Sequence, residues 1–273
     1  MKSNNKITIN FFKSQIPLLK ENYITDNEEL LHQFSIAVER FCYFIFEIDK
    51  LIDGDSDFVR QHTEKRNGIY DMMKNHQDAV KSLGKLFPDD EHMFWNDLNV
   101  CSEKYYKILI REKYENSARN VLSLSDFEDY AVSKHSLAYI PVKGLGYLFE
   151  YKISPAAIES IFTEIFCGIQ MVDDIEDFNA DLFSGQWTYV HSRVEEFMKE
   201  NAIDENTGLD KIRERVLYIS GIGQELTAYA KEKFISAKLL SNKYNLKDLE
   251  HYLDQVISVI TENEKLIQEL TLN

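Results

Sequence analysis

Apolar residues recur every three or four positions along almost the whole chain, which is the spacing of one face of an α-helix. Between residues 27 and 53, for example, Phe34, Val38, Phe41 and Ile45 fall on one face. The same spacing predicts further helices over residues 66–84, 88–116, 123–151, 154–178, 191–200, 208–240 and 246–270. No segment alternates convincingly as a strand would, so we predict an all-α fold of about eight to ten helices.

Helix start signals support several of these boundaries. Pro88 is followed by an acidic first turn, and Ser154 is a suitable N-cap before Pro155 at the first helical position. Within 123–151, by contrast, Pro141 and the glycines that follow it are expected to interrupt the helix. We find no repeat, low-complexity tract or linker, so the whole chain is expected to form a single helical domain.

Composition agrees with a helical fold and narrows the function. The chain has 273 residues, of which 44% are apolar, and only 10 are Gly and 4 are Pro, so turns are sparse and a sizeable core is available. A formal charge of -15 disfavours nucleic acid and anionic membranes as partners, although a metal ion can still bring in a small anion. The three cysteines match no zinc or disulfide pattern, and no signal peptide or membrane span is expected, which favours a cytoplasmic protein.

The first acidic cluster continues an apolar helix face. On a helix turning about 100° per residue, Asp49 falls in the middle of the apolar arc of residues 34–45, and Asp53 falls at its edge. Two carboxylates therefore extend the face that the helix buries.

The second cluster lies in FCGIQMVDDIEDFNADLFSGQW, residues 166–187, and repeats the arrangement. Asp173 shares the arc of the apolar residues 162–169, and Asp177 and Asp181 follow at one-turn intervals on the same side. Asp174 is expected to point away, toward solvent or a neighbouring helix.

Acidic clusters at helix ends are ordinarily solvated surface, and that interpretation stays open. However, both clusters extend buried faces, and both lie at C-terminal helix ends, where the helix dipole disfavours anions. A bound cation would offset both costs. Hard divalent ions take carboxylate oxygens, and Mg²⁺ keeps several waters and bridges to phosphates, so a magnesium and diphosphate site is predicted between the two ends.

Both clusters resemble the motifs of a known family. QMVDDIED, residues 170–177, resembles the second aspartate-rich motif (QxxDDxxD) of trans-prenyl diphosphate synthases and, with Asp181, the metal motif of class I terpene cyclases. DKLID, residues 49–53, is similar to the first DxxxD motif of squalene and phytoene synthases. The resemblance is to the class I isoprenoid synthase superfamily, which implies an all-α bundle around a central apolar cavity with the two motifs facing each other across its mouth.

The resemblance also implies roles for individual residues. The substrate would be an allylic prenyl diphosphate, ionised with the help of a cluster of up to about three Mg²⁺ ions. Asp49, Asp53, Asp173 and Asp177 would be catalytic and would bind the metal together with Asp181, and Gln170, Lys134 and Lys143 would bind the substrate. Lys134 lies 39 residues before Asp173, near where terpene cyclases carry a basic diphosphate sensor, whereas either lysine could equally be surface charge and His135 an ordinary helix residue.

Departures from the family leave the exact reaction open. Residues 1–30 lack the Gly-Lys and Arg motif of prenyl diphosphate synthases, and the chain lacks the C-terminal Arg-Tyr pair of many bacterial terpene cyclases. We favour an atypical terpene synthase, with a chain-elongating or head-to-head prenyltransferase as the alternative. A non-catalytic helical partner subunit is the second alternative, and the resemblance leaves room for a homodimer.

Overall fold

A computed structural model describes residues 11–52, 68–114, 119–205 and 211–272 of this protein. The described part is almost entirely helical, which confirms the all-α prediction. Its α-helices are α2 (Gln15–Leu19), α3 (Glu28–Ile52), α5 (Gly68–Leu86), α6 (Met93–Tyr114), α7 (Leu124–Lys134), α8 (Tyr139–Leu148), α9 (Pro155–Glu176), α10 (Phe178–Ser184), α11 (Tyr189–Glu200), α12 (Ile212–Ile219), α13 (Ile222–Lys243) and α14 (Lys247–Leu272). Short 3₁₀ turns follow α2 (Lys20–Asn22) and α7 (Ser136–Ala138).

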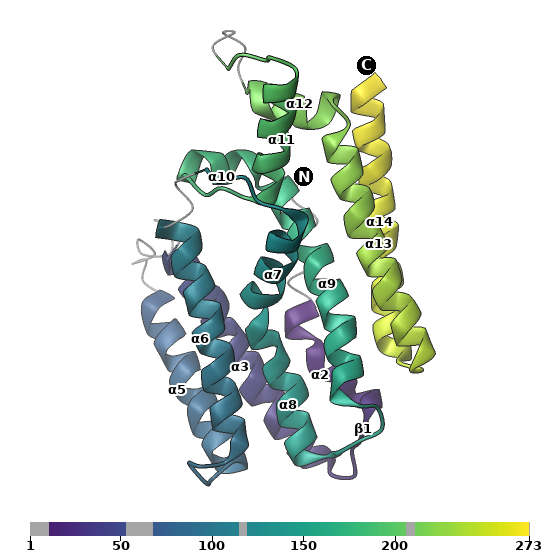
Figure 1. Cartoon of the computed structure of the whole chain (residues 1–273). Helices are drawn as coiled ribbons and strands as arrows, with labels where there is room; N and C mark the ends of the chain where they lie inside the picture. Colours follow the sequence, from purple (N-terminus) through teal and green to yellow (C-terminus); the bar gives the residue numbers. More distant parts are fainter. Residues whose placement is uncertain (1–10, 53–67, 115–118, 206–210, 273) are drawn as a thin grey trace.

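The helices form a bundle with α9 near its centre (Figure 1). On one side α9 packs against α13, which in turn packs against α14, while α3, α5 and α6 lie on the other side. Gly168 of α9 allows the first contact, because a Cβ at this position would lie 2.7 Å from the Phe234 ring of α13. Helices α10 to α12 cover one end of the bundle (Figure 1). This arrangement brings the C-terminal end of α9 next to α10.

Helix α9 begins as its sequence predicts. Ser154 is its N-cap residue and Pro155 occupies the first position, where a missing N–H costs nothing. Most of its side chains from Ala157 to Met171 are buried on more than one side. It is also the described helix that is long and apolar enough to cross a membrane, but 61% of that stretch is buried inside the protein, as expected for a core helix.

The interruption in the segment 123–151 is real, but its predicted position is wrong. The chain leaves the helix at His135 and passes through a 3₁₀ turn before Pro141, which then lies in the first turn of α8 and needs no hydrogen bond there. Gly144 and Gly146 do not interrupt α8. Glycine is needed at both positions because other side chains occupy the space that a Cβ would take. A Cβ on Gly144 would lie 2.2 Å from the Phe34 ring, and one on Gly146 would lie 1.8 Å from the Tyr151 hydroxyl.

Other boundaries also differ from the prediction. The segment 208–240 is divided at Gly221, whose φ of 87° no ordinary helical residue adopts, and residues 178–184 form a separate helix, α10. With the α7–α8 break and the additional helix α2, these breaks raise the number of helices in the described part above the eight to ten expected. Helix α6 starts at Met93 rather than at Pro88. The strands in the described part are a two-residue antiparallel pair, β1 (Tyr23–Ile24) with β2 (Glu150–Tyr151).

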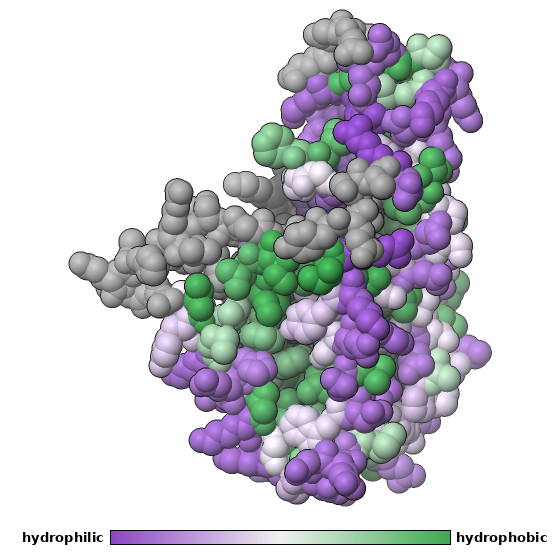
Figure 2. Space-filling view, turned by 60° about the vertical axis from the view of Figure 1, so that its left-hand side comes forward, coloured by the Kyte–Doolittle hydropathy of each residue, from purple (hydrophilic) through white to green (hydrophobic). Residues whose placement is uncertain are grey.

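The surface is not uniformly polar. When the side that carries α5 and α6 is turned forward, apolar side chains gather near the middle of that face among hydrophilic ones (Figure 2). Tyr70 and Met73 of α5 and Tyr43 of α3 are among the large apolar side chains that stay exposed.

Candidate functional site

A cavity of about 670 Å³ lies within the bundle, between α3, the α7–α8 turn, α9 and α10. Its walls are mainly apolar toward the interior, where Leu83 and Ile140 are almost completely buried. Near α10 the lining becomes polar, and Asp177 and Ser184 are exposed to solvent. The cavity is therefore apolar in its interior, and its acidic end is open to solvent.

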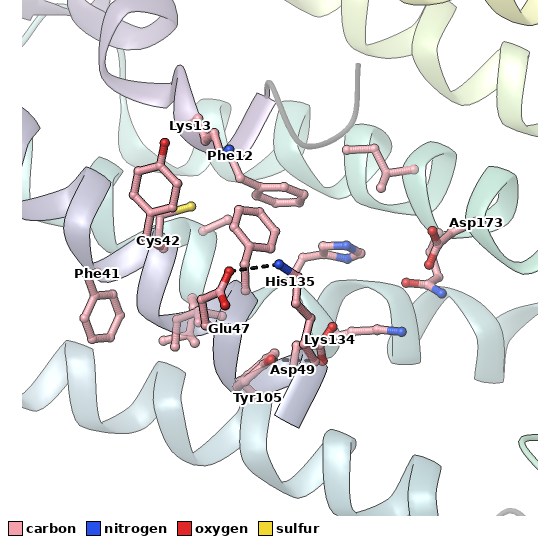
Figure 3. Close-up of a pocket in the computed structure, with 18 of the residues that line it drawn as sticks. Phe12, Lys13, Phe41, Cys42, Glu47, Asp49, Tyr105, Lys134, His135 and Asp173 are labelled. Carbon is pink, nitrogen blue, oxygen red and sulfur yellow. Dashed lines mark hydrogen bonds and ion pairs between the residues drawn. The ribbon is translucent and has the colours of Figure 1, made fainter. Parts of the chain in front are cut away.

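Both acidic clusters contribute to this one cavity. Asp49 reaches it from α3, and Asp173, Asp177 and Asp181 reach it from the end of α9 and from α10. Figure 3 shows Asp49 and Asp173 approaching from different helices, with Lys134 between them. More than 120 residues separate Asp49 from Asp173 in the sequence, so only the fold brings them together. The remaining predicted ligand, Asp53, lies outside the described residues.

Negative charge is concentrated at this end of the cavity. Burial raises the pKa of Asp173 to about 6, and the neighbouring Asp177 adds to the rise while Lys134 opposes it. Burial raises the pKa of Asp181 to about 7, again opposed by Lys134 and supported by Asp177 and Asp173. Ionised carboxylates are thus costly here, and a bound cation would stabilise them.

Lys134 is the cation that partly balances these carboxylates. Its Nζ donates a hydrogen bond to Glu112 Oε1 of α6 at 2.9 Å, and the lysine side chain is 19% exposed. Burial alone would lower the pKa of Lys134, but Tyr130, Glu112 and Asp173 raise it well above its usual range. A protonated amine is therefore held beside the acidic end of the cavity.

Glu112 was not found by the sequence analysis, although it organises this end of the cavity. Its carboxylate is 4% exposed and accepts hydrogen bonds from Lys134, from the Tyr130 hydroxyl at 2.7 Å, and from the Gln186 side-chain amide. It joins α6, α7 and the segment after α10. By pairing with Lys134, Glu112 holds the ammonium group in place.

Tyr105 connects Asp49 to the rest of the site. Its hydroxyl lies 3.4 Å from Asp49 Oδ1. Burial raises the pKa of Tyr105, Asp49 raises it further, and Lys134 lowers it, so both charged groups act on this one phenol. The two halves of the acidic end are therefore electrostatically linked.

Asp174 points toward a neighbouring helix, which is one of the two directions expected, and it is paired with Gln170. Asp174 is 2% exposed, which makes it the most buried aspartate of its cluster; it faces a small cleft next to Tyr130 and Trp187 rather than solvent. Gln170 lines the main cavity, but its Nε2 donates to Asp174 Oδ1 at 2.6 Å. The amide nitrogen of Gln170 thus orients Asp174, a role that the helical projection did not predict.

Lys143 does not lie at the cavity. Its Nζ is 3.0 Å from Asp97 Oδ1 of α6, and the Tyr147 hydroxyl lies 2.6 Å from the other oxygen of the same carboxylate. The resemblance implied a substrate contact for Lys143, but this residue lies about one turn into α8 and pairs with Asp97 instead. The structure therefore gives Lys143 a structural ion pair and does not support the predicted substrate contact.

The apolar part of the cavity is rich in aromatic rings. Phe12, Phe41 and Phe46 line it, together with Ile45 and Ile169. His135 lines it as well, and its imidazole lies nearly parallel to the rings of Phe12 and Phe166, at centroid distances of 5.3 and 5.1 Å. The apolar wall of the cavity therefore contains both aliphatic side chains and electron-rich aromatic rings.

The donor set fits Mg²⁺ in its chemistry. Four carboxylates offer hard oxygen donors, and burial raises the pKa values of two of them, Asp173 and Asp181, so a bound cation would favour their ionised forms. Within the described ranges, however, no three acidic, histidine or cysteine side chains are grouped closely enough to hold a metal ion by themselves. Water and ligand oxygens would have to complete the coordination, as is usual for Mg²⁺.

Comparison with known proteins gives no assignment. The chain matches neither a protein-family model nor a curated protein sequence. The functional argument consequently depends on the site alone.

Proposed function

We propose that this chain is a Mg²⁺-dependent class I terpene synthase that ionises an allylic prenyl diphosphate and guides the resulting carbocation to a terpene. The observation that carries the proposal is the meeting of Asp49 with Asp173, Asp177 and Asp181 at the open end of one apolar cavity. An amphiphile with a highly charged head and a hydrocarbon tail matches this division of the lining. The all-α bundle is compatible with the class I isoprenoid synthase fold that the motifs suggest.

The charged end would hold the diphosphate. Asp49, Asp173, Asp177 and Asp181 would hold Mg²⁺, which as a Lewis acid supplies stabilisation of the leaving diphosphate. Lys134 is protonated and would donate hydrogen bonds to diphosphate oxygens, which requires it to share or leave its contact with Glu112. As the allylic C–O bond breaks, its electron pair moves to the diphosphate oxygen, where these positive groups stabilise it.

The apolar end would protect the carbocation. Its aliphatic and aromatic lining excludes water, which would otherwise trap the cation as an alcohol. Ring faces such as those of Phe12 and Phe46 attract positive charge without reacting with it. Shape and ring placement would then select the product.

A prenyltransferase is the second candidate, and one observation favours it. Lys13 and Lys50 also line the cavity, and Figure 3 shows Lys13 well apart from Lys134. Lys50 pairs with Glu47 at 2.8 Å, and Lys13 lies 4.7 Å from the Tyr43 ring centroid. These two cations could hold the diphosphate of a second substrate.

A turnover assay tests the proposal and separates the candidates. The purified chain is incubated with Mg²⁺ and geranyl, farnesyl or geranylgeranyl diphosphate, with and without isopentenyl diphosphate. Hydrocarbon or alcohol from one allylic substrate supports a terpene synthase, and a longer diphosphate that needs isopentenyl diphosphate supports an elongating prenyltransferase. A symmetrical condensation product from the allylic substrate alone supports a head-to-head enzyme. Absence of diphosphate release from every substrate would favour the non-catalytic partner subunit.

A further inference from the structure

His135 occupies an unusual position for a histidine, inside the apolar wall of the cavity. Its ring lies nearly parallel to both neighbours, at interplanar angles of 1° to Phe12 and 17° to Phe166. The chain leaves α7 at this residue, and the 3₁₀ turn that follows directs the chain along the cavity. A phenylalanine or leucine would fill such a position without the cost of burying polar atoms. An imidazole at this position therefore indicates a chemical role rather than a packing role alone.

The hydrogen bonding of His135 defines which nitrogen is free. Nδ1 lies 2.8 Å from the carbonyl oxygen of Ala131, and because a carbonyl can only accept, Nδ1 must carry the proton. In a neutral ring the lone pair is then on Nε2. Within the described residues no hydrogen bond to Nε2 is found, and the His135 side chain lines the cavity.

The surroundings keep this ring neutral. Burial lowers the pKa of His135 to about 4, the adjacent Lys134 lowers it as well, and Glu112 and the Ala131 carbonyl oppose the shift. At neutral pH the lone pair is therefore available. If the ring takes up a proton, the imidazolium stays in contact with the aromatic rings of Phe12 and Phe166, which can stabilise a cation.

We propose that His135 Nε2 is the base that ends the reaction by removing a proton from the carbocation. The inference rests on the proposed terpene synthase activity and adds a catalytic residue to it. A C–H bond next to the cationic carbon breaks, its electron pair forms the new C=C bond, and the proton moves to the Nε2 lone pair. A weak base suffices because a carbocation is a very strong acid. The imidazolium then passes the proton to the released diphosphate, which restores the neutral ring.

The proposal makes His135 responsible for the choice between alkene and alcohol. Without a base in the wall, the cation persists until water adds to it. Three variants separate this role from packing. His135→Phe keeps a flat ring beside Phe12 and Phe166 but has no lone pair, and His135→Ala leaves space for added imidazole. His76→Phe is the matched control, since His76 packs against Phe44 with ring centroids 4.5 Å apart and does not line the cavity.

The test measures diphosphate release and the alkene-to-alcohol ratio for the allylic substrate that the wild type consumes fastest. His135→Phe should release diphosphate within about threefold of wild type while its alkene-to-alcohol ratio falls roughly tenfold or more, in line with loss of a positioned base. Imidazole should restore alkene formation in His135→Ala, and His76→Phe should match wild type. An unchanged ratio in His135→Phe, or a wild type that forms no alkene, overturns the assignment of His135 and leaves the synthase proposal standing. A wild type that releases no diphosphate from any substrate overturns both.

Discussion

The Lys134–Glu112 pair offers the sharpest test of the electrostatics at the acidic end. Lys134→Met keeps the length and much of the apolar stem of the side chain but removes its charge. Among the described residues, Lys134 is the cation that acts on Glu112, Asp173 and Asp174 together, and this variant removes it. The variant therefore measures how much this lysine stabilises the buried carboxylates.

The expected loss follows from burial. Lys134 is 19% exposed and Glu112 is 4% exposed, and removing one partner of such a pair typically costs about 3–5 kcal/mol, because the other charge is left uncompensated. Lys107→Met is the control on α6. Lys107 and its partner Glu103 are 72% and 58% exposed, so this pair should contribute less than about 1 kcal/mol.

Urea unfolding of both variants at pH 7.5 and pH 5 provides the measurement. Lys134 lowers the pKa values of Asp173 and Asp181, so without it both carboxyl groups protonate more readily in the folded protein. The cost of Lys134→Met should consequently shrink at pH 5, where protonation removes the uncompensated charge. A loss below about 1 kcal/mol at pH 7.5, equal to that of Lys107→Met, would refute the reasoning.

Three further changes have defined outcomes. Asp181→Asn should stabilise the ligand-free protein by about 1–2 kcal/mol at pH 8 after allowance for solvent screening, because the folded pKa of about 7 lies above the ordinary 3.8. The gain should fade as the pH falls from about 7 toward 3.8, because the folded carboxyl is then protonated and the unfolded carboxyl approaches its own pKa; a gain that grows on acidification contradicts the sign. Gly144→Ala should cost about 1–3 kcal/mol in thermal or urea unfolding because its Cβ meets the buried Phe34 ring, whereas Gly84→Ala, with open space around it, should stabilise slightly; equal effects would contradict this packing. Asp174→Asn should change unfolding free energy at pH 7 by less than about 1 kcal/mol, because burial raises the pKa of Asp174 and the amide resembles the protonated acid; a loss of several kcal/mol would mean that it is ionised.

Helical periodicity was enough to predict the fold class and most helix positions. Helix α3 was expected over residues 27–53 and is observed over Glu28–Ile52. The prediction succeeded because apolar residues spaced three and four apart fit one face of a helix and do not fit the alternation of a strand. The break at Gly221 and the position of the α7–α8 turn were not predicted. Glycine tolerates a helix interior when another ring fills the space, as Phe34 does at Gly144, and that requirement is visible only in three dimensions.

The candidate site was predicted in part, for a similar reason. Asp49 and Asp173 were found because they continue buried faces, and the structure places both at one cavity. The same rule applied to α6 would have identified Glu112, which continues the buried face of Cys101, Tyr105 and Leu109. Lys143 was given a substrate contact that the structure does not support, because the direction of a side chain depends on which neighbouring helix lies beside it. For the same reason the sequence pattern could not choose between solvent and a neighbouring helix for Asp174.

The central claim is that the two acidic clusters act together on one Mg²⁺-bound diphosphate. Isothermal titration with a non-reactive allylic thiolodiphosphate tests it directly, in the presence and absence of Mg²⁺, for the wild type and for Asp49→Asn, Asp173→Asn and the distant control Asp97→Asn. We predict Mg²⁺-dependent binding by the wild type and by Asp97→Asn that either cluster variant weakens at least tenfold, a loss of about 1.4 kcal/mol or more. Binding that needs no Mg²⁺, or that survives the loss of both Asp49 and Asp173, would contradict the account.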